Sequence, residues 1–201
     1  MVLYLMKMNF GKFDLKLAHE WTIASTLNVG KTIFEIVLLN LTDSDGLVGL
    51  GESAPSTRYK ENVNTVMEFL KKVDANRLSF DDVAGSMNYL ETFPGNYAGK
   101  CAVNIALLDG AARKAGQPVY DLLNLGFTEN RHVTSFTIGI DTPDIIRKKV
   151  FEAESYPILK LKVGGPDDQR NMTALREAGP KKTVRLDANE GWKTKEDALR
   201  N

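Results

Sequence analysis

Two lysines, Lys160 and Lys162, stand two positions apart in the short apolar segment 158–163. In a β-strand both amines would leave the same face, and the intervening apolar side chains would leave the other. Two ammonium groups about 7 Å apart in a poorly solvated interior repel each other, and desolvation also disfavours their charge. Both effects lower a lysine pKa, which is how a lysine becomes a base near neutral pH. The alternative is an edge strand that carries two solvated lysines.

A carboxylate and an amide follow in the next apolar segment. Asp187 and Asn189 have the same parity at the end of a strand expected over 183–188. Carboxylates at the C-terminal ends of parallel strands are where barrel enzymes place metal ligands. The alternative is a turn, because Asp, Asn and Gly all favour turns.

Three other features have weaker signals. Thr137 shares a strand face with small residues, which leaves room for a substrate but equally fits cross-strand packing. The segment 49–53 reads as a glycine-bearing turn, and it lacks the third glycine and the helix of a dinucleotide fingerprint. Cys101 lies among alanines in a predicted helix, where a small core residue is expected rather than a nucleophile.

Composition narrows the partners. The 201 residues include 26 basic and 26 acidic side chains, so the electrostatic footprint of a nucleic-acid or membrane-surface protein is missing. A single cysteine excludes an internal disulfide and suits a reducing compartment. We therefore expect a cytoplasmic protein that binds a small molecule, not nucleic acid or a membrane. We also expect a homo-oligomer.

The order of the predicted strands and helices that must position these residues changes near Gly126. Before it, a meander of about three strands precedes helices expected over 62–73, from Ser79–Asp82 (read as a capping box) onward, and over 98–115. After it, strands expected over 132–140, 158–163 and 183–188 alternate with helices, which implies parallel pairing. A complete (β/α)₈ barrel takes about 250 residues. We therefore expect a fragment of a barrel protein in preference to a short open α/β domain.

Taken together, these motifs resemble the muconate-lactonizing branch of the enolase superfamily, and within it the dipeptide epimerases. The resemblance covers essentially the whole chain, through segments 49–58, 102–123, 134–143, 159–164 and 187–192. It implies an α+β capping domain over 1–125, followed over 126–201 by the first three β/α units of a truncated TIM-type barrel.

The resemblance also implies roles for individual residues. Lys162 would be the acid/base catalyst on one face of the substrate, and Lys160 would assist it and bind the carboxylate or enolate oxygen. Asp187 would be one of three Mg²⁺ ligands, and the other two carboxylates are not in this sequence. Asn189 and Thr137 would contact the substrate. A chain with only one of the three carboxylates is expected to be inactive by itself.

The loop 21–28 should close over the barrel mouth and set specificity, with Ser25 and Thr26 among the substrate-binding residues. It contains no Arg or Lys, which favours a dipeptide with a neutral second residue. The leading hypothesis is thus a Mg²⁺-dependent dipeptide epimerase. A cycloisomerase or an o-succinylbenzoate-synthase-type lyase is the alternative within the superfamily. A non-catalytic α/β module that binds an anion through the lysines is the alternative of another class.

Overall fold

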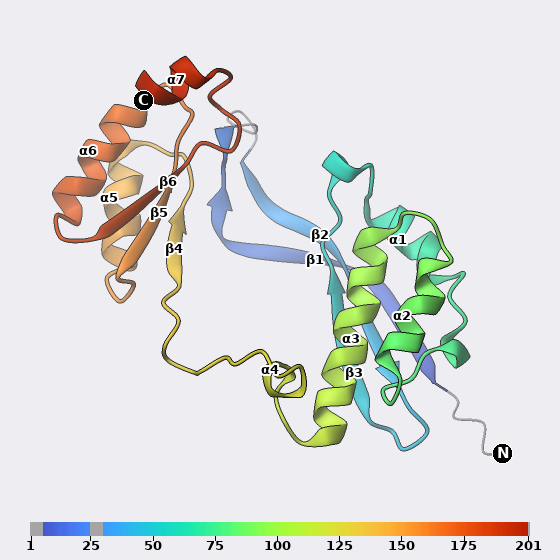
Figure 1. The fold of residues 1–201 in the computed structure, drawn as a ribbon. Coiled ribbons are helices and arrows are strands. Elements are labelled where there is room, and N and C mark those ends of the chain that lie inside the picture. Colours follow the sequence, from blue (N-terminus) through green and yellow to red (C-terminus); the bar gives the residue numbers. More distant parts are fainter. Residues whose placement is uncertain (1–5, 25–29, 201) are drawn as a thin grey trace. The chain divides into compact units, whose positions relative to one another are not determined.

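The protein forms two compact units in a computed structural model that describes residues 6–24 and 30–200. The first unit comprises residues 1–15 and 33–127, and the second comprises residues 16–32 and 128–201 (Figure 1). The linear division predicted from the sequence assigns 16–32 to the first part. In the structure this segment packs with the later β/α units, where the Ile140 N–H donates to the Thr22 carbonyl at 3.1 Å.

A three-stranded sheet has the order β1 (Lys7–Trp21), β2 (Lys31–Thr42), β3 (Val48–Ser53). The first unit contains β1 up to Leu15, β2 from Ile33 and the whole of β3. Strands β2 and β3 run antiparallel, with Thr42 opposite Val48. The Asp43 carboxylate closes the connection by accepting from the N–H groups of Asp45 and Leu47 at 3.0 and 2.9 Å. Gly46 adopts a φ of 82°, which the turn requires and glycine supplies without strain.

Helix α3 (Tyr97–Ala115) packs against β3, and the helices α1 (Val63–Leu70), α2 (Val83–Glu91) and the short α4 (Val119–Leu122) pack against α3. Asn62 and Thr65 form a capping box at α1. Helix α2 is capped by Asp82, whose carboxylate accepts from Gly85 N–H at 2.8 Å. Ser79 binds the Asp81 N–H instead, so its predicted role as the start of a capping box is wrong.

Two glycines of β3 allow the strand to pack closely on α3. A Cβ added at Gly49 or Gly51 would collide with the backbone carbonyl of Ala106 or Ala102, respectively. The segment predicted as a glycine-bearing turn is therefore a strand, and its glycines serve strand–helix packing. Cys101 is exposed on α3, so the expected core position is wrong. The helix turns its neighbours Ala102 and Val103 to the core instead.

The second unit contains a parallel sheet in the order β4 (Ser135–Ile138), β5 (Ile158–Lys162), β6 (Thr183–Asp187). Helices α5 (Pro143–Glu152) and α6 (Asp168–Ala178) follow the first two strands, and α7 (Lys195–Arg200) follows the third. Pro143 occupies the first turn of α5, where a proline removes no helical hydrogen bond. Leu159, Leu161 and Ile138 are fully buried among apolar residues of α5 and α6.

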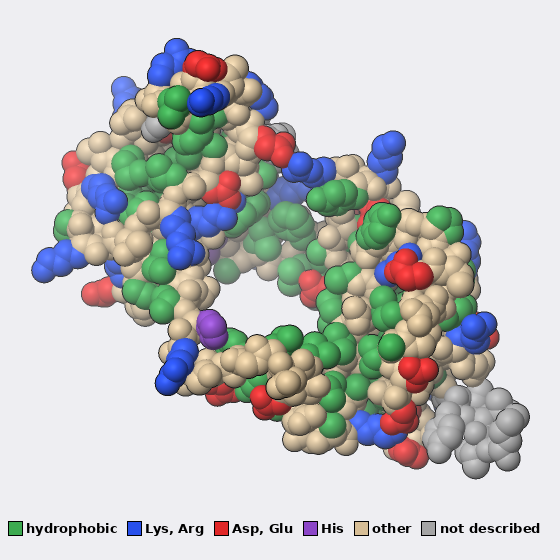
Figure 2. Space-filling model, viewed as in Figure 1, with side chains coloured by type: hydrophobic (Ala, Val, Ile, Leu, Met, Phe, Trp, Pro, Cys, Tyr) green, Lys and Arg blue, Asp and Glu red, His purple; other side chains and the backbone are tan. Residues whose placement is uncertain are grey.

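The architecture is thus an α+β capping domain together with three β/α units, out of the eight that a complete barrel contains. Among the described residues no helix is both long and apolar enough to cross a membrane. On the face shown in Figure 2, Lys and Arg side chains are interspersed with Asp and Glu.

Candidate active site at the ends of the parallel strands

Strand register places the predicted site residues on one face of the parallel sheet. Lys160 pairs with Thr137 of β4 on one side and with Arg185 of β6 on the other, and Lys162 pairs with Asp187. The intervening leucines of β5 pack under the helices. Because alternate residues of a strand leave opposite faces, the two lysines lie on the face that the helices do not cover.

The Asp187 carboxylate receives both lysines. Its Oδ2 lies 2.7 Å from Lys160 Nζ and 2.8 Å from Lys162 Nζ. Lys162 is almost fully buried, with 5% of its surface exposed, whereas about a third of the Lys160 side chain is exposed. The sequence argument considered the repulsion between the two ammonium groups and their desolvation, and no anion beside them. The structure places an anion against both of them, which offsets that repulsion.

Asn189 completes this cluster from the turn after β6. Its side-chain Oδ1 accepts a hydrogen bond from Lys162 Nζ at 2.6 Å, and its backbone N–H donates to Asp187 Oδ1 at 2.9 Å. The backbone turns through two left-handed residues, Asn189 at φ 43° and Glu190 at φ 64°. Asn tolerates this conformation better than most residues, so the same residue type serves both the turn and the hydrogen bond.

Three donors surround the Asp187 carboxylate and hold the pKa of Asp187 well below its usual range. The hydrogen bond from Lys160 has the largest effect, followed by those from Lys162 and from the Asn189 N–H. All three stabilise the charged form. The lowered pKa favours the anionic form of Asp187, which is the form that binds a divalent cation.

The oxygen atoms of Asp187 and Asn189 are of the chemical type that binds a hard cation. A carboxylate oxygen and an amide oxygen are ligands that Mg²⁺ prefers, and Asp187 and Asn189 supply both at the end of β6. Among the described residues no group of three or more His, Cys, Asp or Glu side chains is placed to hold a metal ion. Asp187 is the predicted ligand that this chain contributes.

The remaining predicted residues are distributed as follows. Thr137 lies in β4 on the lysine face, as the register partner of Lys160. Ser25 and Thr26 lie outside the described residues. The sequence argument gave no role to Trp21, whose ring the structure places over Lys162, with Nζ 5.5 Å from the ring centroid. The signal available in the sequence was its position at the start of the predicted specificity loop.

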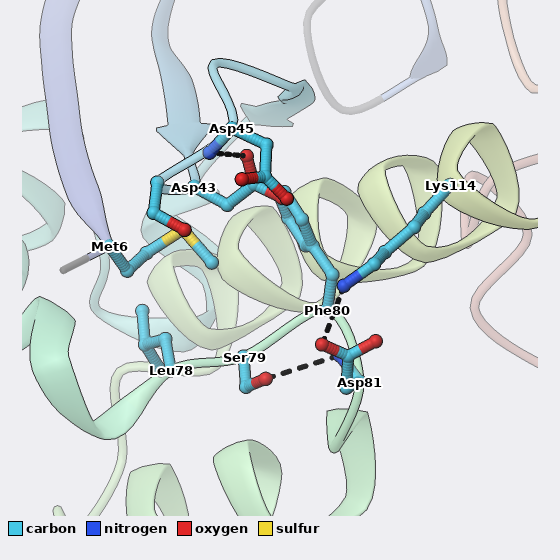
Figure 3. Close-up of a pocket in the computed structure, with 9 residues that line it drawn as sticks. Met6, Asp43, Asp45, Leu78, Ser79, Phe80, Asp81 and Lys114 are labelled. Atoms are coloured by element: carbon cyan, nitrogen blue, oxygen red, sulfur yellow. Dashed lines mark hydrogen bonds and ion pairs between the residues drawn. The ribbon is translucent and has the colours of Figure 1, made fainter. Parts of the chain in front are cut away.

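A cavity in the first unit is too small to compete with this site. It lies between the turn after β2 and the segment before α2, and its volume is about 20 Å³ (Figure 3). Lys114 reaches into its rim and pairs with Asp81 at 2.6 Å. Such a volume holds about one water molecule, so this cavity is too small for a substrate.

Comparison with known proteins identifies the family to which the chain belongs. The family model for the mandelate racemase / muconate lactonizing enzyme N-terminal domain matches residues 18–124, more than half of the chain. An L-Ala-D/L-amino acid epimerase of Pedosphaera parvula is 60% identical over 195 residues, which cover 96% of this chain and 56% of the relative. An L-Ala-D/L-Glu epimerase of Bacteroides thetaiotaomicron is 36% identical over 199 residues, 96% of this chain and 50% of the relative.

A solved structure agrees with these relatives. The dipeptide epimerase of Cytophaga hutchinsonii, complexed with Mg and the dipeptide D-Ala-L-Val, superimposes with a TM-score of 0.80 at 28% identity. The alignment covers 99% of this chain and 55% of that structure. The chain thus spans about half the length of the curated relatives it matches.

Proposed function

Because the chain belongs to the mandelate racemase / muconate lactonizing enzyme family, we propose that the full-length protein is a dipeptide epimerase. It would invert the configuration at the α-carbon of one residue of a dipeptide by removing and returning a proton. The observation that carries the proposal is the buried Lys162 amine, which lies with Lys160 and Asp187 at the ends of β5 and β6. The epimerase relatives at 60% and 36% identity support the same reaction.

The proposed chemistry begins from the weak acidity of a proton beside a carboxylate or amide carbonyl. Removal of this proton builds negative charge on the carbonyl oxygens, and the barrier falls when fixed positive groups stabilise that charge. Lys162, in its neutral form, would take the α-proton from one stereoisomer. Lys160, which lies beside it at the shared Asp187 carboxylate, would stabilise the developing enolate oxygen.

Asp187 would hold Mg²⁺, with Asn189 close enough to contact the ion or the substrate. When bound, the ion supplies Lewis-acid stabilisation of the carboxylate oxygens. Return of the proton to the opposite face needs a second base there, and the resemblance implies a lysine from a further barrel strand. A single carboxylate holds Mg²⁺ poorly, so we propose that the 201-residue chain alone is inactive.

Dipeptides that begin with alanine are the first substrates to test, because both named relatives act on L-Ala dipeptides. The loop 21–28 carries no Arg or Lys, so we propose a neutral second residue over glutamate. We also propose a cytoplasmic location, which suits the single exposed thiol of Cys101. Assembly into a homo-oligomer stays a prediction.

Isotope exchange in the full-length protein tests the function. The wild-type protein with Mg²⁺ should exchange the α-proton of both stereoisomers with solvent deuterium. Lys162→Ala should abolish exchange for one stereoisomer and leave exchange of the other measurable, because the two bases act on opposite faces. Lys181→Ala, an exposed lysine of the same unit, is the matched control. Normal exchange of both isomers by Lys162→Ala would refute the assigned base, and no exchange by the wild type would refute the function.

A further inference from the structure

The ring of Trp21 and the amine of Lys162 are neighbours in space although they are far apart in sequence. Lys162 Nζ lies 5.5 Å from the centroid of the Trp21 ring, within the distance of about 6 Å at which an aromatic face attracts a cation. The same amine donates to Asp187 at 2.8 Å and to Asn189 at 2.6 Å. The Trp21 ring therefore restricts the position of the Lys162 amine further than Asp187 and Asn189 do alone.

The segment that carries Trp21 is fixed to the end of β4 by backbone contacts. The Thr22 carbonyl accepts from the Ile140 N–H at 3.1 Å. A Cβ added at Gly139 would lie 3.1 Å from the same carbonyl and 3.3 Å from the Thr22 nitrogen. The absence of a side chain at Gly139 therefore lets the segment approach the strand closely.

Two more glycines lie next to Ala24, three residues after Trp21 in the same segment. Gly164 follows β5 with a φ of 102°, and Gly191 lies in the turn after β6. A Cβ added at Gly164 or Gly191 would lie 2.9 or 2.7 Å from the Ala24 methyl carbon. The Ala24 methyl group thus occupies space that both glycines leave open, and a larger side chain at position 24 does not fit there.

We propose that Trp21 is a positioning residue for Lys162, and that Ala24, seated on Gly164 and Gly191, holds it in place. The ring keeps the amine directed along one face of the site and shields it from solvent. Trp21 acts through Lys162 and needs no contact with the substrate. The catalytic consequence rests on the proposed epimerase function, whereas the contact between ring and amine does not.

The catalytic consequence is measured by isomer-resolved α-proton exchange in the full-length protein. In Trp21→Leu, exchange of the isomer that depends on Lys162 should slow by about tenfold, because the amine loses the ring that directs it and misplacement of a reacting group lowers the rate. Exchange of the other isomer should change less than about twofold, and KM should stay close to that of the wild type. Trp21→Phe should recover most of the rate, because it keeps an aromatic face.

The control is Phe151→Leu, which removes an exposed aromatic ring from the same unit and should leave both exchange rates unchanged. Equal slowing of both isomers in Trp21→Leu would show a general structural role and overturn the proposal. Unchanged exchange of both isomers would also overturn it.

A double-mutant cycle tests the contact without any catalytic assumption. The shift in denaturation midpoint caused by Trp21→Leu should be smaller in a Lys162→Met background than in the wild type, because the cation is already absent. Additive shifts would overturn the proposed contact. A wild-type protein that shows this coupling but no exchange would refute the epimerase function and leave the contact standing.

The packing of Ala24 against Gly164 and Gly191 can be tested separately. Ala24→Val should displace the segment and reproduce the isomer-selective slowing of Trp21→Leu, since the added methyl groups meet Gly164 and Gly191. Ala198→Val, at an exposed position of α7, is the matched control. A wild-type exchange rate in Ala24→Val would show that the packing of Ala24 against these glycines does not position Trp21.

Discussion

Lys162 and Asp187 are register partners on adjacent parallel strands, and Nζ of the lysine lies 2.8 Å from Oδ2 of the aspartate. The pair lies at the C-terminal ends of β5 and β6, where the backbone leaves the sheet and side chains become free to meet a ligand. The ion pair limits both the availability of the amine as a base and the availability of the carboxylate for a cation, because each group is bound to the other. Substitutions at this pair and around it are therefore expected to affect stability and ion binding together.

Removal of the Asp187 charge should weaken both folding and Mg²⁺ binding. In Asp187→Asn the two ammonium groups lose their shared anion, and we expect a loss of about 2 kcal/mol in unfolding free energy, typical of hydrogen bonds to charged groups. We expect Mg²⁺ to bind the full-length variant at least about a hundredfold more weakly, by calorimetric titration, because a neutral amide replaces a charged ligand. Asp144→Asn, whose side chain is 95% exposed, should change neither quantity. Unaltered Mg²⁺ affinity in Asp187→Asn would contradict the assigned ligand.

Two substitutions at Asn189 separate its amide from its backbone conformation. Asn189→Gly keeps an easy left-handed backbone but loses the hydrogen bond to Lys162, and we expect it to lower the unfolding free energy by about 2 kcal/mol. Asn189→Ala must also adopt the φ of 43°, which adds about 1 kcal/mol. Denaturant titration of both variants measures the difference. Equal stability of the two would show that the backbone conformation at this position carries no cost.

Helix α3 is expected to depend on a cap that is distant in sequence. Its own N-cap residue, Asn96, makes no side-chain cap hydrogen bond. The buried Glu61 carboxylate instead accepts from the N–H groups of Tyr97 and Ala98 at 2.6 and 2.9 Å. Glu61→Ala should therefore lower the unfolding free energy by about 1–2 kcal/mol. The exposed Glu68→Gln should leave it nearly unchanged, and an equal effect of both substitutions would remove the capping role.

Two glycine-to-alanine substitutions test the strand–helix packing. Gly51→Ala places a methyl group against the Ala102 carbonyl of α3, and we expect a loss of at least about 2 kcal/mol because backbone atoms have to move. At Gly11, in β1, an added Cβ meets nothing within 4 Å, so Gly11→Ala should change stability by less than about 0.5 kcal/mol. Thermal melts of both variants give the comparison, and a neutral Gly51→Ala would mean that β3 is free to move away from α3.

Most elements of the fold were predictable because their sequence periods are strong. The alternation of apolar and polar residues in 158–163 and 183–188 predicted strands with one apolar face, and the structure buries Leu159 and Leu161 on that face. The glycines of β3 were misread because glycine favours both turns and close packing, and only the position of α3 decides between them. The same limit applied to Cys101, since a helix rich in small residues gives a weak signal for its buried face.

The site was predictable where spacing fixes geometry, and less so elsewhere. The i, i+2 parity of Lys160 and Lys162 follows from strand geometry alone, and the position of Asp187 beside them follows from parallel pairing. The shared Oδ2 contact and the Trp21 ring depend on side-chain packing between segments that are distant along the chain. No local pattern around Trp21 encodes its neighbour, and the catalytic roles themselves stay predictions until the exchange experiments are done.

The second unit's use of residues 16–32 limits how this protein can be recombined with its relatives. A crossover near residue 126 joins the first part of one gene to the barrel strands of another, and it transfers Trp21 and Ala24 away from the glycines and the lysine that they contact. Hybrid proteins made at that boundary should therefore inherit mismatched pairs at positions 21 and 162, and at positions 24, 164 and 191. In evolution and in engineering, these residues are expected to be exchanged as a set.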